Sequence, residues 1–257
     1  MLTFVGLGLW DERSITVEGR AALRDADRVF AEFYTSRLMG TDVDALAAHH
    51  DVDIEVRDRA GVEGDPGPIL DAAAAGDAVF LTAGDTMIST THVDLRLRAH
   101  DRGIDTRVIH GTTAEAAAAS LTGLQNYRFG KATTLPFPYA HGAETVPGSV
   151  CDTLDDNRDR GLHTLVYLDI KREREEYMTA DIAANLLAEG YEDRLAVAVC
   201  RAGSPEPTVE ADRLSELADR AFGDPLHLIV VPGDLHHIEA DALRELADAP
   251  PELTEPI

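Results

Sequence analysis

Short apolar runs that end at glycine-containing loops alternate with helical segments along this chain, and this alternation limits the folds open to it. Three of these runs are residues 2–5, 78–82 and 106–109, and the loops that follow them are Gly6-Leu7-Gly8, Ala83-Gly84-Asp85 and His110-Gly111. Continuous apolar strands are typical of parallel sheets that helices cover on both faces. Strands that alternate with helices therefore predict an α/β fold with a parallel sheet.

The alternation continues to the end of the chain. In the first half we expect strands over residues 2–5, 28–33, 53–56, 78–82 and 106–109, and helices over 15–25, 42–48, 66–75 and 93–102. In the second half we expect helices over 113–121, 150–160, 179–189 and 212–221, and strands over 162–170, 195–202 and 226–231. No linker rich in glycine, serine or proline separates the halves. Element order alone places a domain boundary after residue 112, which gives α/β domains over 1–112 and 113–257.

The charge balance excludes one class of partner. The 257 residues carry 23 basic and 47 acidic side chains, for a net charge of −24. Nucleic acid is excluded as the main partner, because neutralising phosphates requires an excess of lysine and arginine. Aspartate outnumbers glutamate, and Lys131 and Lys171 are the only lysines. This composition resembles that of proteins from salt-loving archaea, in which molar salt screens the self-repulsion of the carboxylates.

The sequence lacks the motifs that identify several other classes of protein. No apolar run approaches the ~20 residues of a membrane span, so we expect a soluble cytoplasmic protein. Cys151 and Cys200 form no CxxC pair and are expected to be structural thiols in a reducing compartment. The chain contains no HExxH motif, P-loop or GxSxG elbow. We expect no metal site, because neighbours such as His236 and His237 point apart on a helix or strand.

The first glycine loop has two interpretations. Glycines after a strand allow a ligand to approach the main chain, as in a dinucleotide-binding loop. The third glycine of GxGxxG would fall at Asp11, however, and an acid there would repel a pyrophosphate. This argues against a nicotinamide or flavin site, despite Glu32 at the end of the second strand. The alternative is a tight turn between strand and helix.

Later strand ends offer further candidates. Asp85 follows a buried strand, and its carboxylate could accept hydrogen bonds from sugar hydroxyls or an ammonium group. Alternatively, it caps the next helix. The strand ends Tyr167-Leu168-Asp169, Arg201-Ala202-Gly203 and Pro225-Leu226-His227 would add loops from the second half to a single cleft.

The order of the motifs is more specific than any one of them. They are FVGLGLWDERSITVEG, AEFYTS, AGDTMIST, KATTLPFPYA, GLHTLVYLDIK, RAGSPEPT, FGDPLHLIVVPG and LHHIEADAL. In this order they resemble the diphthine synthases over nearly the whole chain. The glycine loops are shared across the wider tetrapyrrole methylase superfamily, whereas AEFYTS, GLHTLxxLDIK and RAGSxxPT are more specific. Two positions depart from the pattern: Thr86 stands where relatives often have proline, and Thr113-Ala114 replaces a Ser-Ile pair.

The resemblance implies a fold and an activity. The fold would be that of a two-domain class III methyltransferase, with an N-terminal parallel-sheet domain and a C-terminal mixed-sheet α/β domain. S-adenosylmethionine would bind in the cleft between the domains, and the enzyme would be a homodimer. It would repeatedly methylate the amino group of a 3-amino-3-carboxypropyl group on one histidine of translation elongation factor 2. The products would be diphthine and S-adenosylhomocysteine.

The resemblance also implies a set of cofactor contacts. Carried over position by position, they are Leu9, Asp85, Ile88, Thr113, Ala114, Leu168, Ala202 and His227. No catalytic residue is assigned. The amine proton can pass to solvent or to a base, and His110, His227 and Asp85 remain open as candidates for that base.

Other functions remain as alternatives. One is a methyltransferase of the same fold that acts on a tetrapyrrole, and another is a non-catalytic partner of the elongation factor that retains the cofactor pocket. A nicotinamide oxidoreductase is a third, against which Asp11 argues. The charged run over residues 171–176 is expected to be solvated and self-paired, with docking of an acidic protein as its alternative.

Overall fold

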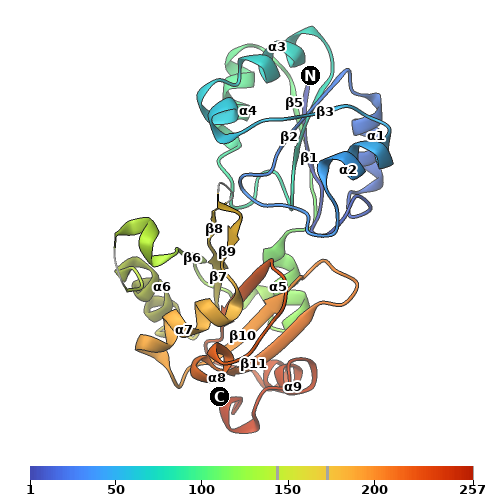
Figure 1. The fold of residues 1–257 in the computed structure, drawn as a ribbon. Coiled ribbons are helices and arrows are strands. Elements are labelled where there is room, and N and C mark those ends of the chain that lie inside the picture. The colour runs from blue at the N-terminus through green and yellow to red at the C-terminus, as the bar shows by residue number, and fades with distance from the viewer. Residues whose placement is uncertain (143–144, 172–173, 257) are drawn as a thin grey trace. The chain divides into compact units, whose positions relative to one another are not determined.

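The computed structural model describes residues 1–142, 145–171 and 174–256, and its chain divides into two compact units (Figure 1). The first unit is Met1–Ala114 and the second is Glu115–Ile257. Each unit has its own five-stranded sheet and its own apolar core. Two residues of the charged run, Arg172 and Glu173, lie outside the described part of the chain.

The first unit is an open parallel sheet with the strand order β3-β2-β4-β1-β5. Its strands are β1 (Leu2–Gly6), β2 (Arg28–Glu32), β3 (Ile54–Val56), β4 (Ala78–Thr82) and β5 (Thr106–Ile109). Its helices are α1 (Val17–Asp25), α2 (Val43–His50), the short π-helix η1 (Ala60–Gly64), α3 (Gly67–Ala75) and α4 (Val93–Asp101). All its strands therefore end at the same edge of the sheet, and this edge carries the glycine loops.

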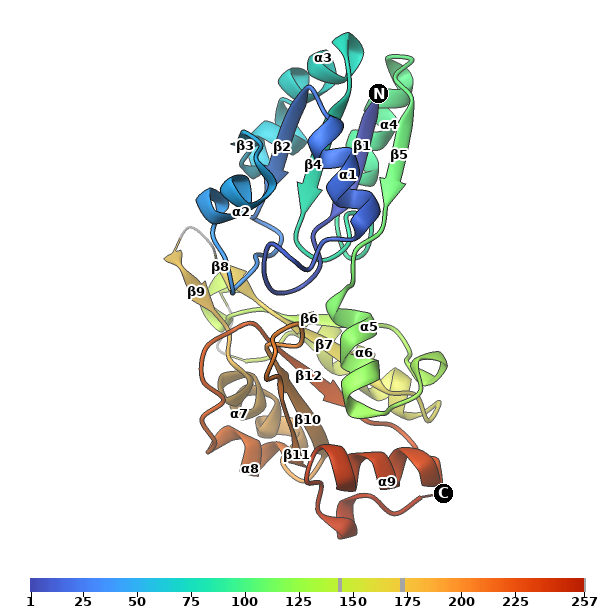
Figure 2. The same cartoon turned by 90° about the vertical axis from the view of Figure 1, so that its right-hand side faces the viewer.

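Helices cover both faces of this sheet, as continuous apolar strands require. Phe4 and Phe80 pack on one face with residues of α3 and α4, and their rings meet edge to face at 5.9 Å. The neighbouring Val5 and Leu81 face the opposite way and pack with residues of α1 and α2. Figure 2 shows the two helical layers on either side of the strands.

The second unit contains a mixed sheet with the strand order β11-β10-β12-β7-β6. Only the β6–β7 pair in it is parallel; the other three pairs are antiparallel. The strands are β6 (Thr133–Leu135), β7 (Thr164–Leu168), β10 (Leu195–Cys200), β11 (Thr208–Arg213) and β12 (His227–Val231), with a separate hairpin of β8 (Ile170–Lys171) and β9 (Glu176–Tyr177). A parallel sheet in the first unit and a mixed sheet in the second confirm the predicted fold class.

Helices also cover the second sheet. They are α5 (Ala114–Thr122), which begins at the last residue of the first unit, α6 (Gly148–Arg158), α7 (Ala180–Tyr191), α8 (Leu214–Ala218) and α9 (His237–Leu246), with the 3₁₀ turns η2 (Asn126–Arg128), η3 (Pro138–His141) and η5 (Pro251–Leu253). The core on one face joins strand residues such as Val166 and Ile229 to residues of α6, α7 and α8. Helices α5 and α9 lie on the other face (Figure 2).

Two sequence predictions need correction here, and some elements were not predicted. The helix expected over residues 212–221 is wrong at its start, because Asp212 belongs to β11 and pairs with Ala196. The strand expected over 162–170 is shorter, since β7 ends at Leu168 and β8 begins at Ile170. Strands β6, β9 and β11 and helix α9 were not predicted.

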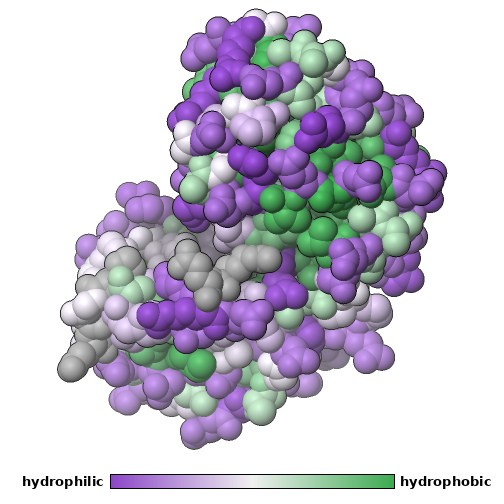
Figure 3. All heavy atoms as spheres, turned by 45° about the horizontal axis from the view of Figure 1, so that its top comes forward, coloured by the Kyte–Doolittle hydropathy of each residue, from purple (hydrophilic) through white to green (hydrophobic). Residues whose placement is uncertain are grey.

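The surface follows the composition. Figure 3 shows hydrophilic side chains over much of the viewed face of each unit, with smaller hydrophobic areas between them. Many of the carboxylates are strongly exposed, as Asp71 and Asp193 illustrate. Within the described ranges, no helix has both the length and the apolar character needed to cross a membrane.

Candidate functional site

Three glycines bring the carboxyl ends of β1, β4 and β5 into backbone contact. A Cβ atom on Gly6 would lie 2.5 Å from the Gly111 nitrogen and 2.6 Å from the Gly84 carbonyl oxygen, and a Cβ on Gly111 would overlap that same oxygen. Gly84 has a φ of 75° and open space where a Cβ would lie, so its main chain is accessible from outside. This edge is therefore closely packed inside and open outside, as a ligand-binding strand end requires.

The buried carboxylate of Asp85 connects the loops that follow β4 and β5. Its Oδ1 accepts a hydrogen bond from the Met87 amide at 2.8 Å, which holds its own loop. Its Oδ2 lies 2.8 Å from His110 Nδ1 and accepts from the Gly111 amide at 3.1 Å. The Asp85 side chain is only 2% exposed. The carboxylate therefore orders the loops, and the main chain around it is what remains for a ligand.

The other candidates of the first unit lie along the same edge. Leu9 follows Gly8, which exchanges two backbone hydrogen bonds with Gly84 at 3.2 and 2.7 Å. Ile88, in the loop after β4, is 42% exposed. Thr113 and Ala114 follow β5 and lead into α5. The five candidates from this half are thus at the ends of the three adjacent strands β4, β1 and β5.

In the second unit, strand register brings Leu168 and His227 to one end of the sheet, with Ala202 in the turn beyond it. Strand β7 ends at Leu168, and its preceding residue pairs with the residue after His227. His227 itself pairs with Cys200, the last residue of β10. Ala202 lies in the turn two residues later. The structure thus gathers the predicted residues into one cluster in each unit.

His227 is buried, and both of its ring nitrogens have main-chain partners. Nδ1 accepts a hydrogen bond from Ala180, the first residue of α7, at 3.0 Å, and Nε2 donates to the Asp224 carbonyl oxygen at 2.8 Å. Because the first amides of a helix have no acceptor within the helix, the ring acts as a cap for α7. Burial lowers the pKa of His227, so the ring is neutral. His227 has no free nitrogen for proton transfer.

Arg201 holds the turn that carries Ala202. Its Nη1 donates to the carbonyl oxygens of Phe222 and Asp224 at 2.6 and 2.9 Å. The Asp224 carbonyl is the same group that accepts from His227. The RAGSPEPT and FGDPLHL segments, which are far apart in sequence, therefore form one hydrogen-bonded unit.

Comparisons with known proteins agree with this geometry. The model of the family "Tetrapyrrole (Corrin/Porphyrin) Methylases" matches residues 1–218. The diphthine synthase of Halorubrum lacusprofundi is 73% identical over 264 residues, covering 99% of this chain and 100% of the relative. The diphthine synthase of Methanosarcina acetivorans is 48% identical, covering 99% of each chain. A crystal structure of a diphthine synthase has a TM-score of 0.92 at 38% identity and covers 100% of this chain and 99% of that one.

This chain belongs to the diphthine synthase family. The family is confirmed for the chain as a whole, whereas the individual cofactor contacts stay predictions. Two buried polar pairs that the sequence did not reveal also involve residues of these motifs, one pair in each unit.

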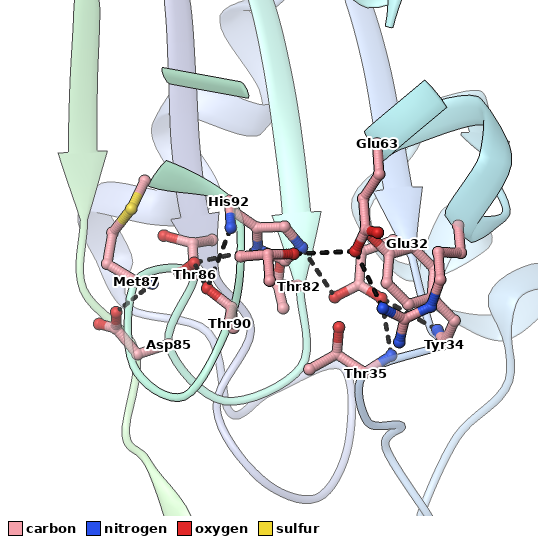
Figure 4. A network of polar contacts seen from close by, with 12 residues as sticks. Glu32, Tyr34, Thr35, Glu63, Thr82, Asp85, Thr86, Met87, Thr90 and His92 are labelled. Atoms are coloured by element: carbon pink, nitrogen blue, oxygen red, sulfur yellow. Dashed lines mark hydrogen bonds and ion pairs between the residues drawn. The ribbon is translucent and has the colours of Figure 1, made fainter. Parts of the chain in front are cut away.

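The first pair joins Glu32 of the AEFYTS motif to His92, two residues after the AGDTMIST motif. Glu32 Oε2 accepts hydrogen bonds from the amides of Tyr34 and Thr35, both at 2.9 Å. Its Oε1 faces His92 Nε2 at 3.5 Å, while His92 Nδ1 donates to the Thr86 carbonyl oxygen at 3.0 Å (Figure 4). Burial raises the pKa of Glu32 and lowers that of His92. The pair anchors the loop that contains the candidate contacts after β4.

Several atoms of this network have no hydrogen-bond partner within the described part of the chain: Glu32 Oε1, Tyr34 OH, Thr86 Oγ1 and His92 Nε2. The Thr86 hydroxyl arises from the departure noted above, since a proline has no such group. A proton on Glu32 would turn its Oε1 into a donor facing His92 Nε2. This agrees with the raised pKa of the carboxyl group.

The second pair lies at the start of α9, in the LHHIEADAL motif. Glu239 Oε1 accepts hydrogen bonds from the Gln125 amide at 2.9 Å and from His163 Nε2 at 3.1 Å. Its Oε2 accepts from the His236 amide at 2.9 Å and completes a capping box. His163 Nδ1 accepts in turn from the Gly233 amide at 3.0 Å. Glu239 therefore connects the start of α9 to His163, the residue before β7, and to the segment after α5.

The capping box and the two buried pairs differ in how much signal the sequence contains for them. The capping box has a sequence signal, a polar residue followed three positions later by glutamate, but histidine is not a usual N-cap residue. The histidine partners of Glu32 and Glu239 are 60 and 76 residues distant in sequence. No metal-binding group of three or more His, Cys, Asp or Glu side chains occurs among the described residues.

Proposed function

We propose that this chain transfers methyl groups from S-adenosylmethionine to the amino nitrogen of a 3-amino-3-carboxypropyl group on a histidine of translation elongation factor 2. The observation that carries this proposal is full-length identity of 73% to a diphthine synthase, together with the matching fold. It is thus a methyltransferase that makes diphthine in diphthamide biosynthesis, with S-adenosylhomocysteine as by-product.

The strand ends of the first unit fit this cofactor. The open main chain at Gly84 lies at the carboxyl edge of a parallel sheet, where such folds bind nucleoside ligands. S-adenosylmethionine supplies a methyl group that its sulfonium sulfur already activates. The protein's contribution is then to align the acceptor amine and exclude water, and alignment can supply about 7–11 kcal/mol.

We propose the same cofactor contacts as the sequence predicts, with their roles divided by burial. Leu9, Ile88, Thr113 and Ala114 would contribute from the first unit, chiefly through main-chain atoms and apolar surface. Asp85 would act by holding its loop. Leu168, Ala202 and His227 would contribute from the second unit, with His227 fixed in place by α7.

A transfer assay in concentrated KCl tests the activity. The purified chain is incubated with methyl-labelled S-adenosylmethionine and elongation factor 2 that carries the 3-amino-3-carboxypropyl histidine. We expect label on this factor, with mass spectrometry counting the methyl groups, and none on a control factor with unmodified histidine. Binding of the donor without transfer would favour a non-catalytic partner, and methylation of a tetrapyrrole would favour that alternative.

Asp85→Ala tests the first cluster. The substitution removes the three hydrogen bonds that hold two strand-end loops, so we expect the Kd for S-adenosylmethionine to rise about tenfold, equivalent to about 1.4 kcal/mol. Asp71→Ala is the control, since Asp71 is exposed and pairs with Arg102 on the surface. Calorimetry that finds equal affinity in both variants would remove Asp85 from the site.

We also propose that the chain forms a homodimer and acts in the cytoplasm, as the resemblance to the family implies. Light scattering in brine measures the mass in solution. A monomer at all concentrations would contradict the first part of this proposal.

A further inference from the structure

Methylation of an amine requires that the nitrogen lose a proton, and the proposed function, on which this inference rests, assigns no group to accept it. An α-amino group has a pKa of about 8, so near neutral pH most of it is ammonium without a lone pair. In each transfer the nitrogen lone pair forms a bond to the methyl carbon, and the electron pair of the broken carbon–sulfur bond passes to sulfur. One proton must therefore leave the nitrogen for every methyl group added.

The two histidines at the candidate strand ends differ in whether a ring nitrogen is free to accept a proton. His227 has both ring nitrogens occupied by main-chain groups. His110, directly after β5, has Nδ1 2.8 Å from Asp85 Oδ2. An ionised carboxylate can only accept, so Nδ1 carries the hydrogen and the lone pair lies on Nε2. No described residue forms a hydrogen bond with this Nε2, and the His110 side chain is 75% exposed.

The ring of His110 is held by a rigid support. Asp85 is fixed on its other side by the Met87 amide, and its Oδ2 also binds the amide of Gly111, the next residue in the chain. Gly111 is in turn packed against the backbone of Gly84. A buried carboxylate in this position selects the tautomer of a histidine and stabilises the imidazolium that forms when Nε2 takes up a proton.

His110 is also well placed along the chain. It lies three residues before Thr113, a proposed cofactor contact, and its partner Asp85 is in the loop that contains Ile88. Its exposed Nε2 can exchange protons with bulk water after each transfer. Repeated methylation requires this, because the base must be returned to its neutral form before the next proton is removed.

We propose that His110 is the general base of the methyl transfer. Nε2 takes one proton from the acceptor ammonium before each methylation and passes it to water, while Asp85 holds the ring and balances its charge.

His110→Ala is the direct test, with the transfer assay and donor affinity measured in parallel. General acid–base catalysis typically contributes about 10²–10⁴-fold, so we expect kcat to fall by about a hundredfold or more while the Kd for S-adenosylmethionine changes less than about twofold. Added imidazole should restore part of the lost rate, because it can occupy the space of the missing ring and accept the proton. The control is His100→Ala, since His100 is in α4 and contacts Thr106 at the opposite end of β5.

The outcomes separate this inference from the proposed function. If the wild-type chain transfers no methyl group to the modified factor, the proposed function fails. If the wild-type chain is active and His110→Ala retains its rate, His110 is not the base. A slow variant that imidazole does not rescue, or one whose donor affinity falls in proportion to its rate, would assign His110 to binding and overturn the inference.

Discussion

Neither Glu32 beside His92 in the first unit nor Glu239 beside His163 in the second has exposed side-chain surface, yet the pKa values of the two carboxyl groups shift in opposite directions. Burial raises the pKa of Glu32, and the amide hydrogen bonds it receives do not compensate. Burial also raises that of Glu239, but hydrogen bonds from the His236 and Gln125 amides and from His163 outweigh it, so the net pKa is lowered.

The difference lies in where the donors are. Both amides that reach Glu32 bind one oxygen, and Oε1 is left facing a lone pair of His92. The donors to Glu239 are divided between its two oxygens. Glu32 also lies deeper in the protein than Glu239, so the depth of burial and the hydrogen-bond donors together set the direction of each pKa shift.

The largest expected effect is from Glu239→Gln. Both oxygens of Glu239 accept hydrogen bonds, so the NH₂ group of glutamine would face another donor at one of these positions. Removing one partner of a buried pair costs about 3–5 kcal/mol. We expect the free energy of unfolding to fall by about 3 kcal/mol in denaturant titrations. A loss below about 1 kcal/mol would mean that the Glu239 network does not hold a charge.

Glu32→Gln should behave differently. Its amide can keep the acceptor oxygen toward Tyr34 and Thr35 and place its NH₂ group toward His92 Nε2, where a donor is missing. We expect the free energy of unfolding to stay within about 1 kcal/mol of the wild type. A loss as large as that of Glu239→Gln would show that Glu32 is charged in the folded state.

The two pairs should also respond oppositely to pH. Glu239 has a folded pKa below its unfolded value of about 4.3, so its contribution is complete above that pH and is lost as the pH falls. Glu32 has a folded pKa above that value, so its contribution is complete at lower pH and is lost as the pH rises through the folded pKa. The deficit of Glu239→Gln should therefore shrink on acidification.

Denaturant titrations of both variants and the wild type between about pH 3 and about pH 7 measure this difference. Relative to the wild type, Glu32→Gln should become more stable as the pH rises. Parallel curves for the two variants would remove the contrast between the pairs.

The smallest expected effect is that of salt on the same variants. Raising KCl from about 0.5 M to about 3 M should increase the Tm of the wild type, because it screens the exposed carboxylates. The buried pairs are out of reach of ions, so the difference between wild type and Glu239→Gln should stay nearly constant. A difference that changes with KCl would place ions or water at Glu239.

Much of the fold could be predicted from sequence because its strands are continuous apolar runs. Residues 78–82 of β4 are such a run, and their prediction is confirmed. Strand β11 has no such pattern: it contains Glu210 and Asp212, is only partly buried and lies at the edge of its sheet, so its charged residues favoured a helix. Helix α9 begins at a histidine pair that gave no conventional start signal.

The candidate site could be predicted in part for a similar reason. Loops at strand ends are visible in the sequence, so Asp85 was found from its position alone. What Asp85 contacts could not be predicted, because His110 is 25 residues away and the contact depends on β4 and β5 lying on either side of β1. The capping role of His227 could not be predicted either, because Ala180, whose amide it accepts from, lies 47 residues away in the sequence.

The contact among Gly6, Gly84 and Gly111 also limits how this enzyme can be redesigned. Adding a single methyl group at Gly6 or Gly111 would push neighbouring strand ends apart and displace Asp85 with them. Mutant libraries aimed at new methyl acceptors should keep Gly6 and Gly111 fixed and vary the exposed positions around them.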